Sequence, residues 1–289
     1  MVIQEHIPVG SKTTMRIGGK ARYYADILTK EDVREAWTFC QEKGLPLILL
    51  GGGSNTIFAD GEIEALVCRI KADKTSVEGN RVTVESGKIL ASLVNELANN
   101  NLDLSALTGI PGTVGGAIFG NAGQGPGGIW IDSFVQSVTA FIDGQWKTLT
   151  KEECDFRYRE SKFKDLKSPP IIWEVTLSVP SKPAADVKAE VERLIKKRIE
   201  TQPHIKTAGS CFKALPDGTP AWKLIDAAGL RGLQIGGVQV SEKHANFLLN
   251  VAQGTFKDAL AVTAEIQKNI PQIAGVEMRL YGENGAIAS

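Results

Sequence analysis

Two dense clusters of glycine constrain this chain more than any other feature of its sequence. Nine glycines fall between positions 109 and 128, and a second cluster, Gly51 to Gly53, directly follows the apolar residues 47–50. Glycine loses more conformational freedom on folding than any other residue, so such clusters indicate that the backbone must approach something closely. Because bare main-chain N–H groups can surround an anion, we expect the two loops to hold one long ligand with a pyrophosphate.

The composition is typical of a globular protein, with 43% hydrophobic and 23% charged residues among 289. This length allows a large core and two or three subdomains. The formal net charge of zero argues against a general binder of nucleic acid or of anionic membranes. No apolar run approaches the roughly 18 residues needed to span a membrane, and no signal peptide is evident. We therefore expect a cytoplasmic protein with no nucleic-acid partner and no membrane insertion.

The cysteines and histidines predict neither a disulfide framework nor a metal site. Cys40, Cys68, Cys154 and Cys211 are widely spaced and form no C-x-x-C pair. Such spacing is typical of free thiols in a reducing compartment. Only three histidines occur and they are scattered, so no bound metal is expected.

Hydrophobic periodicity predicts an α+β fold. Thr29 with Asp32 three residues later is typical of a helix N-terminus, and Gly44 is typical of its end. Asp143-Gly144 predicts a hairpin of residues 138–142 and 145–149. A second helix is expected at residues 89–99, and strands are expected at 47–50, 65–70, 82–85 and, with one solvated face, 171–179.

Pro180 and Pro183 interrupt the apolar periodicity and mark a boundary between two parts of the chain. Beyond them, helices are expected over residues 187–199, 220–228 and 255–270, and strands over residues 238–240, 247–250 and 276–281. No internal repeat is found. We place domain edges near residues 70 and 185.

Two common nucleotide-binding motifs do not explain the glycines. No Walker A pattern occurs in the sequence. A formal G-x-G-x-x-G at Gly123, Gly125 and Gly128 follows no strand, contains Pro126, and leads into residues 129–131 instead of a helix. It therefore does not predict a dinucleotide fold of the Rossmann type.

Short motifs along the chain instead resemble those of the UDP-N-acetylenolpyruvoylglucosamine reductase (MurB) family, in the same order and with the same spacing. The elements that resemble its FAD-binding segments are residues 14–19, 51–55, 109–117 and 121–123. Elements that resemble its Y-R-x-S, R-x-x-x-Q-P and G-S-x-F-K motifs are residues 158–161, Arg198 with Gln202-Pro203, and residues 209–213. The match continues through residues 224–226, 229–232, 240–241 with 244–247, and 277–283, and in all it covers roughly residues 13–283.

This resemblance implies a two-part FAD-binding domain of the PCMH type, as in the vanillyl-alcohol oxidase superfamily, plus a C-terminal α+β substrate-binding domain. The expected parts are FAD-binding subdomain 1 at residues 1–70, FAD-binding subdomain 2 at 71–185, the substrate-binding domain at 186–275, and a C-terminal strand returning to the active site at 276–289.

The resemblance also implies a reaction. NADPH is the expected hydride donor, FAD is expected to bind without a covalent tether, and the substrate is a UDP-sugar whose enolpyruvyl ether is reduced to a lactyl ether. The product would be UDP-N-acetylmuramate, a precursor of peptidoglycan. The residues implied to bind the cofactor are Arg16, Gly51, Gly52, Gly53, Ser54, Asn55, Pro111, Gly112, Thr113, Gly115, Gly116, Asn121 and Gly123.

Three residues are implied to be catalytic. Arg159 would stabilise the negative charge that builds on the substrate, and Ser210 would donate a proton to its carbon. Glu277 would assist at the carboxylate, with Glu283 as the competitor for that role. Without the resemblance, Arg159 is more often a surface or salt-bridged arginine and Ser210 more often a turn serine, and Glu277 would suit a solvent-facing strand position.

The residues implied to bind the substrate are Tyr158, Lys213, Arg231, His244 and Asn246, with Lys213 at the diphosphate. Taken without the resemblance, His244 is more often a packed or capping histidine. Cys211 and His244 could also suggest a thiol hydrolase. We discount that function because no third group orients the pair and the glycine loops would stay unexplained.

The chain departs from the family pattern in two places. Ala214 replaces an amide expected to contact the substrate, and Gln124-Gly125-Pro126 stand where the family has a small residue, tyrosine and glycine. The short segment between Ser161 and Ile171 fits the type II subclass, which lacks an extra tyrosine-bearing loop. Two alternatives stay open: another FAD oxidoreductase of the same fold, and a catalytically silent protein that binds flavin or a nucleotide sugar.

Overall fold

The chain forms two compact units, each assembled from segments that are far apart in the sequence. The structure, a computed structural model, describes residues 1–123, 128–273 and 275–288. Unit 1 comprises Met1–Val2, Ala25–Gly52 and Cys68–Arg198, and unit 2 comprises Ile3–Tyr24, Gly53–Val67 and Ile199–Ser289. The division into domains near residues 70 and 185 stays a prediction.

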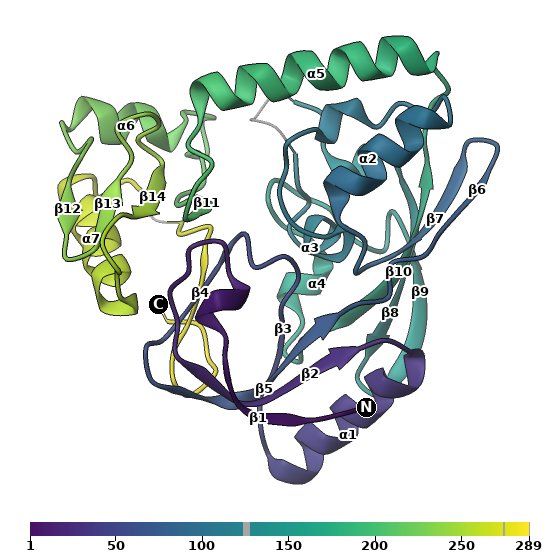
Figure 1. Ribbon diagram of the computed structural model, residues 1–289, viewed down its shortest axis with the longest axis horizontal. Coiled ribbons are helices and arrows are strands. Elements are labelled where there is room, and N and C mark those ends of the chain that lie inside the picture. Colours follow the sequence, from purple (N-terminus) through teal and green to yellow (C-terminus); the bar gives the residue numbers. More distant parts are fainter. Residues whose placement is uncertain (124–127, 274, 289) are drawn as a thin grey trace. The chain divides into compact units, whose positions relative to one another are not determined.

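Unit 1 is built on an antiparallel five-stranded sheet of order β6-β7-β10-β8-β9 (Figure 1). Its strands are β6 (Thr75–Glu78), β7 (Arg81–Glu85), β8 (Val135–Ile142), β9 (Gln145–Thr150) and β10 (Ile171–Ser178). Helix α3 (Val114–Phe119) packs against β7 and β10, and α2 (Leu90–Asn99) adds its buried apolar residues to the same hydrophobic core. The glycine-rich segment before α3 is therefore anchored directly to the sheet.

The remaining helices of unit 1 precede the sheet in the sequence (α1), lie between β9 and β10 (α4) or follow β10 (α5). Helix α1 (Lys30–Lys43) begins after the N-cap Thr29. The Thr29 side chain accepts a hydrogen bond from Asp32 N, and Thr29 N donates one to the Asp32 carboxylate. Trp37 of this helix packs edge-on against Phe141 of β8, with ring centroids 6.1 Å apart. Short α4 (Lys162–Asp165) and long α5 (Ala184–Thr201) follow, and α5 continues into unit 2.

A second sheet has the order β1-β2-β5-β3. Its strands are β1 (Gln4–Pro8), β2 (Lys20–Ile27), β3 (Leu47–Leu49) and β5 (Glu62–Ile70), and the division between the two units falls within β2 and β5. The structure also has three single-turn 3₁₀ helices, at Gly10–Lys12, Ser105–Leu107 and Ile131–Ser133.

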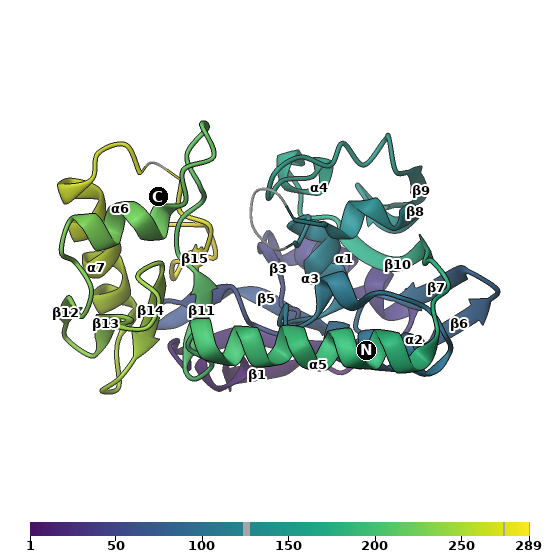
Figure 2. The same ribbon diagram turned by 90° about the horizontal axis from the view of Figure 1, so that it is seen from above.

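Unit 2 has its own sheet and its own core. The antiparallel order is β11-β14-β13-β12, with strands β11 (Thr207–Ser210), β12 (Gln234–Ile235), β13 (Val238–Val240) and β14 (Phe247–Asn250). Helix α7 (Phe256–Asn269) packs against β12 and β13 (Figure 2), and α6 (Ala221–Ala227) contributes Ala221 and Ile225 to the same core. Strand β15 (Arg279–Tyr281) pairs in parallel with β4 (Thr56–Phe58), which joins the C-terminal segment to the segment after the first glycine cluster.

Most elements expected from periodicity are confirmed, with two corrections. The hairpin turn is present, with Asp143 and Gly144 both at positive φ (49° and 81°). The expected solvated face of 171–179 is wrong: Val175 and Thr176, successive residues of β10, are both buried, since α3 packs against β10 and Trp146 packs edge-on against Trp173. The expected last strand at 276–281 begins only at Arg279, since Val276 forms a single bridge to Phe212.

Several short strands were not expected from the sequence. Strand β1 is largely exposed and shows no alternation of buried and exposed residues. Strands β4 and β11 have only three and four residues, too few to show a periodic pattern. Within the described ranges, no helix is long and apolar enough to cross a membrane, and no cluster of metal-ligating side chains forms. The four cysteines are free thiols, as the sequence predicts, and the structure buries all four.

Candidate active site

The two glycine clusters touch each other within unit 1. A Cβ atom added to Gly52 would lie 2.7 Å from the Cα of Gly112, and one added to Gly51 would lie 2.7 Å from Oγ1 of Thr113. Real Cβ atoms do not approach other atoms this closely, so any side chain at these positions would push the two loops apart. After 59 intervening residues the chain therefore returns to form a second loop against the first, and we call the pair the glycine double loop (residues 51–52 and 112–113).

The amides of the glycine double loop fit an anionic cofactor. Among the described residues, the N–H groups of Gly51, Gly52, Gly112 and Thr113 donate no hydrogen bond. Backbone N–H groups in folded proteins are almost always paired, and a cluster of bare donors suits the oxygen atoms of a phosphate or pyrophosphate. The residues present therefore fit the pyrophosphate of FAD.

The neighbouring candidate residues support this loop in different ways. Thr113 caps α3 by accepting a hydrogen bond from Gly116 N at 3.4 Å. Gly115 packs against Ser86, the residue that directly follows β7, since an added Cβ would lie 2.8 Å from the Ser86 Cβ. Pro111 and Gly116 are exposed, so the outer side of the loop is accessible.

The other candidate cofactor residues near the first cluster belong to unit 2. Gly53 has φ 68°, and its carbonyl accepts a hydrogen bond from Thr14 N at 3.0 Å. Arg16 also has positive φ (60°), and its guanidinium donates to the carbonyl of Ser11 at 2.7 Å. Ser54 and Asn55 are half-buried beside them. The backbone at residues 13–16 is thus tied to Gly53 within unit 2.

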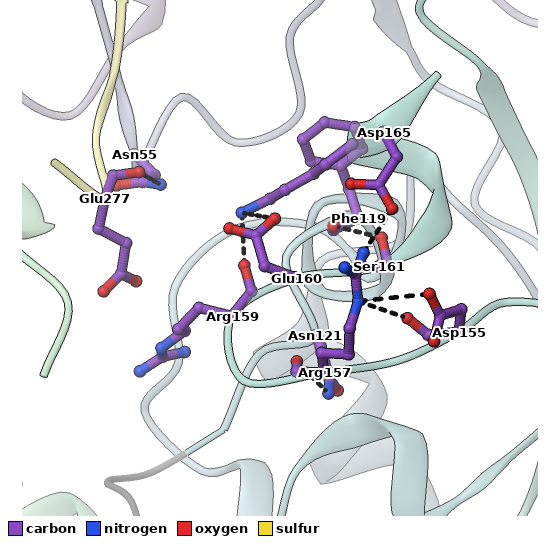
Figure 3. Close-up of polar contacts among 11 residues, drawn as sticks. Asn55, Phe119, Asn121, Asp155, Arg157, Arg159, Glu160, Ser161, Asp165 and Glu277 are labelled. Carbon is purple, nitrogen blue, oxygen red and sulfur yellow. Dashed lines mark hydrogen bonds and ion pairs between the residues drawn. The ribbon is translucent and has the colours of Figure 1, made fainter. Parts of the chain in front are cut away.

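Asn121 joins two segments of unit 1 through its side-chain amide (Figure 3). Its Nδ2 donates to the carbonyl of Arg157 at 3.1 Å, and its Oδ1 accepts from Asp132 N at 3.3 Å. The residue is only 3% exposed. In this arrangement the amide orients the segment that carries Tyr158 and Arg159, while direct contact with the cofactor stays a prediction.

Arg159 is held from several directions within unit 1. Its backbone lies in the left-handed region, with φ 57°, and its carbonyl accepts from Lys164 Nζ at 2.5 Å (Figure 3). Ser161, the last residue of the Y-R-x-S element, donates to the carbonyl of Phe119 at 2.8 Å. The guanidinium carbon of Arg159 lies 5.0 Å from the ring centroid of Trp130.

A second arginine of unit 1 lies near Arg159. The side chain of Arg198 packs over Gly109, where an added Cβ would lie 2.5 Å from its Cδ. Burial, and next the charge of Arg159, lowers the pKa of Arg198. Arg198 forms no ion pair with a carboxylate in the described part of the chain. This region of unit 1 therefore carries concentrated positive charge.

Of the candidate catalytic residues, Glu277 lies on a backbone ladder of unit 2, and Ser210 directly precedes the first residue of that ladder. Ser210 ends β11 after Gly209, which has φ 78°. Glu277 N donates to the carbonyl of Cys211 at 2.7 Å, and Lys213 N donates to the carbonyl of Gly275 at 3.0 Å. The ladder therefore brings Glu277 beside the residue that follows Ser210, although 66 positions separate Cys211 from Glu277 in the sequence.

Further contacts fix this ladder. The Nδ2 of Asn55 donates to the carbonyl of Glu277 at 3.0 Å (Figure 3), and Arg279 N donates to the carbonyl of Asn55 at 2.9 Å. Glu283, the competitor of Glu277, is exposed, and its carbonyl accepts from Glu64 N. Glu277 thus lies on the ladder that follows Ser210, whereas Glu283 pairs with Glu64, and the catalytic role of Glu277 stays a prediction.

Three candidate substrate residues contact protein groups in this structure. The side chain of Asn246, 7% exposed, accepts from Phe212 N at 3.0 Å and donates to its carbonyl at 2.9 Å. Arg231 forms an ion pair with Asp226 and donates to the carbonyl of Glu242 at 2.7 Å. His244 stacks edge-on against Phe247 at 4.8 Å. These side chains position the ladder and its surroundings, and their contact with substrate stays a prediction.

Cys211 has the properties of a packed residue. It is 1% exposed, and burial, with a smaller effect of the Glu277 charge, raises the pKa of its thiol well above the ordinary value. A thiol with such a pKa is protonated at neutral pH and is a poor nucleophile. The structure therefore agrees with rejecting a thiol hydrolase.

Some sequence features fall outside these contacts. Gln124-Gly125-Pro126, and with them the middle of the formal G-x-G-x-x-G, lie outside the described residues. Ala214 is half-buried next to Lys213.

Trp130 was not singled out in the sequence, although it contacts both Tyr158 and Arg159. A single tryptophan just after a glycine-rich run carries no motif that could have identified it.

Comparison with known proteins agrees with this geometry. The family model described as FAD binding domain matches residues 21–148, which include the whole glycine double loop. The model described as UDP-N-acetylenolpyruvoylglucosamine reductase, C-terminal domain, matches residues 199–280, which include Ser210 and Glu277. The expected FAD-binding domain and C-terminal domain are thus confirmed.

Relatives match over nearly the whole chain. The UDP-N-acetylenolpyruvoylglucosamine reductase of Clostridium perfringens is 36% identical over 276 residues, covering 94% of this chain and 89% of the relative. That of Enterococcus faecalis is 36% identical over 283 residues, covering 96% and 93%. The crystal structure of the Thermus caldophilus enzyme (MurB) has a TM-score of 0.84 at 30% identity, covering 97% of this chain and 99% of that one. This chain therefore belongs to the UDP-N-acetylenolpyruvoylglucosamine reductase family.

Proposed function

We propose that this protein uses NADPH and FAD to reduce UDP-N-acetylglucosamine enolpyruvate to UDP-N-acetylmuramate, a cytoplasmic step in the synthesis of peptidoglycan precursors. The observation that carries the proposal is the similarity to reductases of this name over nearly the full length of both chains. The bare amides of the glycine double loop support it, because they fit the cofactor that such a reductase needs.

When bound, FAD would supply the two-electron chemistry by which hydride passes from NADPH to the terminal vinyl carbon of the substrate. The amides of residues 51–52 and 112–113 would hold its pyrophosphate. Delivery of hydride to the vinyl carbon leaves negative charge on the adjacent carbon and on the substrate carboxylate. The role of the chain is to stabilise that charge and to protonate that carbon.

Arg159 is the proposed charge stabiliser, since a guanidinium stays protonated and can form two hydrogen bonds with a carboxylate. The neighbouring charge of Arg198 adds to the positive potential of this part of unit 1.

Ser210 is the proposed proton donor, and Glu277 is proposed to hold the substrate carboxylate or to assist protonation. The ladder at Cys211 and Glu277 supports joint action of these two residues. Lys213, on the same ladder, would contact the diphosphate of the UDP-sugar. Tyr158, Arg231, His244 and Asn246 are proposed to line or support the substrate site.

The decisive experiment separates the two halves of the reaction. Purified protein with its flavin is reduced by NADPH under anaerobic conditions, and loss of the yellow colour is followed by absorbance. Addition of UDP-N-acetylglucosamine enolpyruvate should restore the colour and yield UDP-N-acetylmuramate. Bleaching without recovery would favour another reductase of this fold, and absence of bleaching would favour a silent binding protein.

A further inference from the structure

Trp130 contacts both residues at the centre of the Y-R-x-S element. Its ring centroid lies 5.0 Å from the guanidinium carbon of Arg159, and 5.1 Å from the ring centroid of Tyr158. The two aromatic rings meet edge to face, with an interplanar angle of 70°. One indole therefore contacts two neighbouring side chains of unit 1.

The indole of Trp130 has a fixed position. Its backbone forms an antiparallel bridge with Gly123, and a Cβ added to Gly123 would lie 2.7 Å from the indole Cδ2. Ile131 N donates to the carbonyl of Ala122 at 2.8 Å, and Ser133 N donates to the carbonyl of Trp130 at 3.0 Å. Gly123 thus provides the space into which the indole packs, and the backbone contacts prevent it from moving away.

The guanidinium of Arg159 needs such support. An arginine side chain has several rotatable bonds, and the nearby positive charge of Arg198 repels it. A guanidinium over an aromatic face gains electrostatic attraction and keeps a defined orientation. Stacking on the indole uses the flat face of the guanidinium. Its N–H groups point outward in the plane of the group, so stacking does not block hydrogen bonds from them to a carboxylate.

We propose that Trp130 is a positioning residue for Arg159, holding the guanidinium over its indole face in the orientation needed to meet the substrate carboxylate. This inference rests on the proposed role of Arg159. Trp130 itself takes no part in hydride or proton transfer.

The kinetic test compares Trp130→Leu with Trp130→Phe in the anaerobic assay. Trp130→Leu should slow recovery of colour by the enolpyruvyl sugar about tenfold, while bleaching by NADPH and flavin content stay nearly unchanged. Trp130→Phe should restore most of the lost rate, since it retains an aromatic face. The matched control is Tyr23→Leu, which removes the ring under Arg22 of unit 2 (5.5 Å) and should leave both half-reactions unchanged.

A spectroscopic test does not depend on turnover. The Nε–H resonance of Arg159, assigned in ¹⁵N-arginine-labelled protein with Arg159→Lys, should be displaced by the ring current in the wild type and lose this displacement in Trp130→Leu. Should Trp130→Leu lose its flavin, the smaller displacement expected for Trp130→Phe decides instead. An unchanged resonance in both variants, or equal slowing of both half-reactions by Trp130→Leu, overturns the proposal. Wild-type protein that never recovers its colour overturns the proposed function, while the resonance still tests Trp130.

Discussion

Three asparagines of this chain, Asn55, Asn121 and Asn246, bind backbone groups with their side-chain amides. Asn121 joins the carbonyl of Arg157 to the amide of Asp132, and Asn246 bonds both polar groups of Phe212. A carboxamide carries a donor and an acceptor in fixed geometry, which matches a peptide group. At the residue scale, these side chains place the backbones that carry Arg159 and Ser210.

The proton-donor role is tested by Ser210→Ala. Removal of the hydroxyl should slow recovery of colour by the enolpyruvyl sugar about 10²- to 10⁴-fold, because the substrate carbon then lacks its acid. Bleaching by NADPH should be nearly unchanged, since that step needs no proton at this carbon. Stopped-flow absorbance measures both rates, and equal slowing of the two would remove Ser210 from this role.

The positioning role of Asn246 is tested by Asn246→Ala. The substitution leaves the N–H and C=O of Phe212 without their partner in a buried place, which should cost about 2 kcal/mol in the free energy of unfolding. Urea denaturation measures this loss. Asn100→Ala is the control, because it removes an exposed hydrogen bond to the carbonyl of Glu96 and should cost much less. Equal losses would contradict the structural assignment.

At the scale of elements, helix ends follow local chemistry closely. Both α1 and α7 begin with a threonine and an aspartate three residues later, and in both the reciprocal hydrogen bonds form. In α7, Asp258 also accepts a hydrogen bond from Gly237 N at 3.1 Å, which ties the helix to the turn between β12 and β13. One carboxylate thus serves both the helix and the sheet of unit 2.

Asp258 predicts a pH-dependent stability. Hydrogen bonds from the amide of Thr255, and next from that of Gly237, lower the pKa of the carboxyl group in the folded state. Its contribution is therefore complete above the unfolded pKa of about 4 and is lost as the pH falls through the folded pKa. Asp258→Asn should be less stable than the wild type at neutral pH and nearly equal to it at about pH 2. Urea midpoints at both pH values test this, and a difference independent of pH would be contrary to it.

At the scale of the whole molecule, the described residues include two large hydrophobic cores, each built from segments that are distant in the sequence. The core of unit 1 joins α2 and α3 to β7, β8 and β10, and the core of unit 2 joins residues 15–17 and 57–59 to the C-terminal segment. The glycine double loop exists only because the core of unit 1 brings residue 52 to residue 112. The ladder of Cys211 and Glu277 depends in the same way on the core of unit 2.

The long-range contact of the glycine loops is tested by Gly52→Ala. An added methyl would lie 2.7 Å from the Cα of Gly112, so the loops must separate. Overpacking of this kind costs about 2 kcal/mol, which predicts a Kd for FAD about thirtyfold weaker. Titration of stripped protein with FAD, followed by flavin fluorescence, measures it. Gly79→Ala, whose added methyl meets nothing within 4 Å, should bind FAD as the wild type does; similar weakening by both variants would argue against the contact.

Local signals in the sequence explain which predictions succeeded. Helix caps, the Asp143-Gly144 turn and apolar periodicity act over a few residues, and they identified α1, α2, α7 and the β8–β9 hairpin. The burial of β10 on both faces was missed, because it depends on α3 and Trp146 packing from other parts of the chain. The ordered motifs indicated the family and its cofactor before any coordinates.

The sequence by itself determined the α+β character, the FAD-binding and C-terminal domains, and the family, since these follow from local periodicity and from motif order. Only the tertiary structure decided that the glycine clusters meet backbone to backbone, that Glu277 lies on a ladder with the residue after Ser210, and that Trp130 lies against Arg159. The reason is physical: glycine permits a close approach, but the partner that approaches is set by the packing of a core whose members are far apart in the chain.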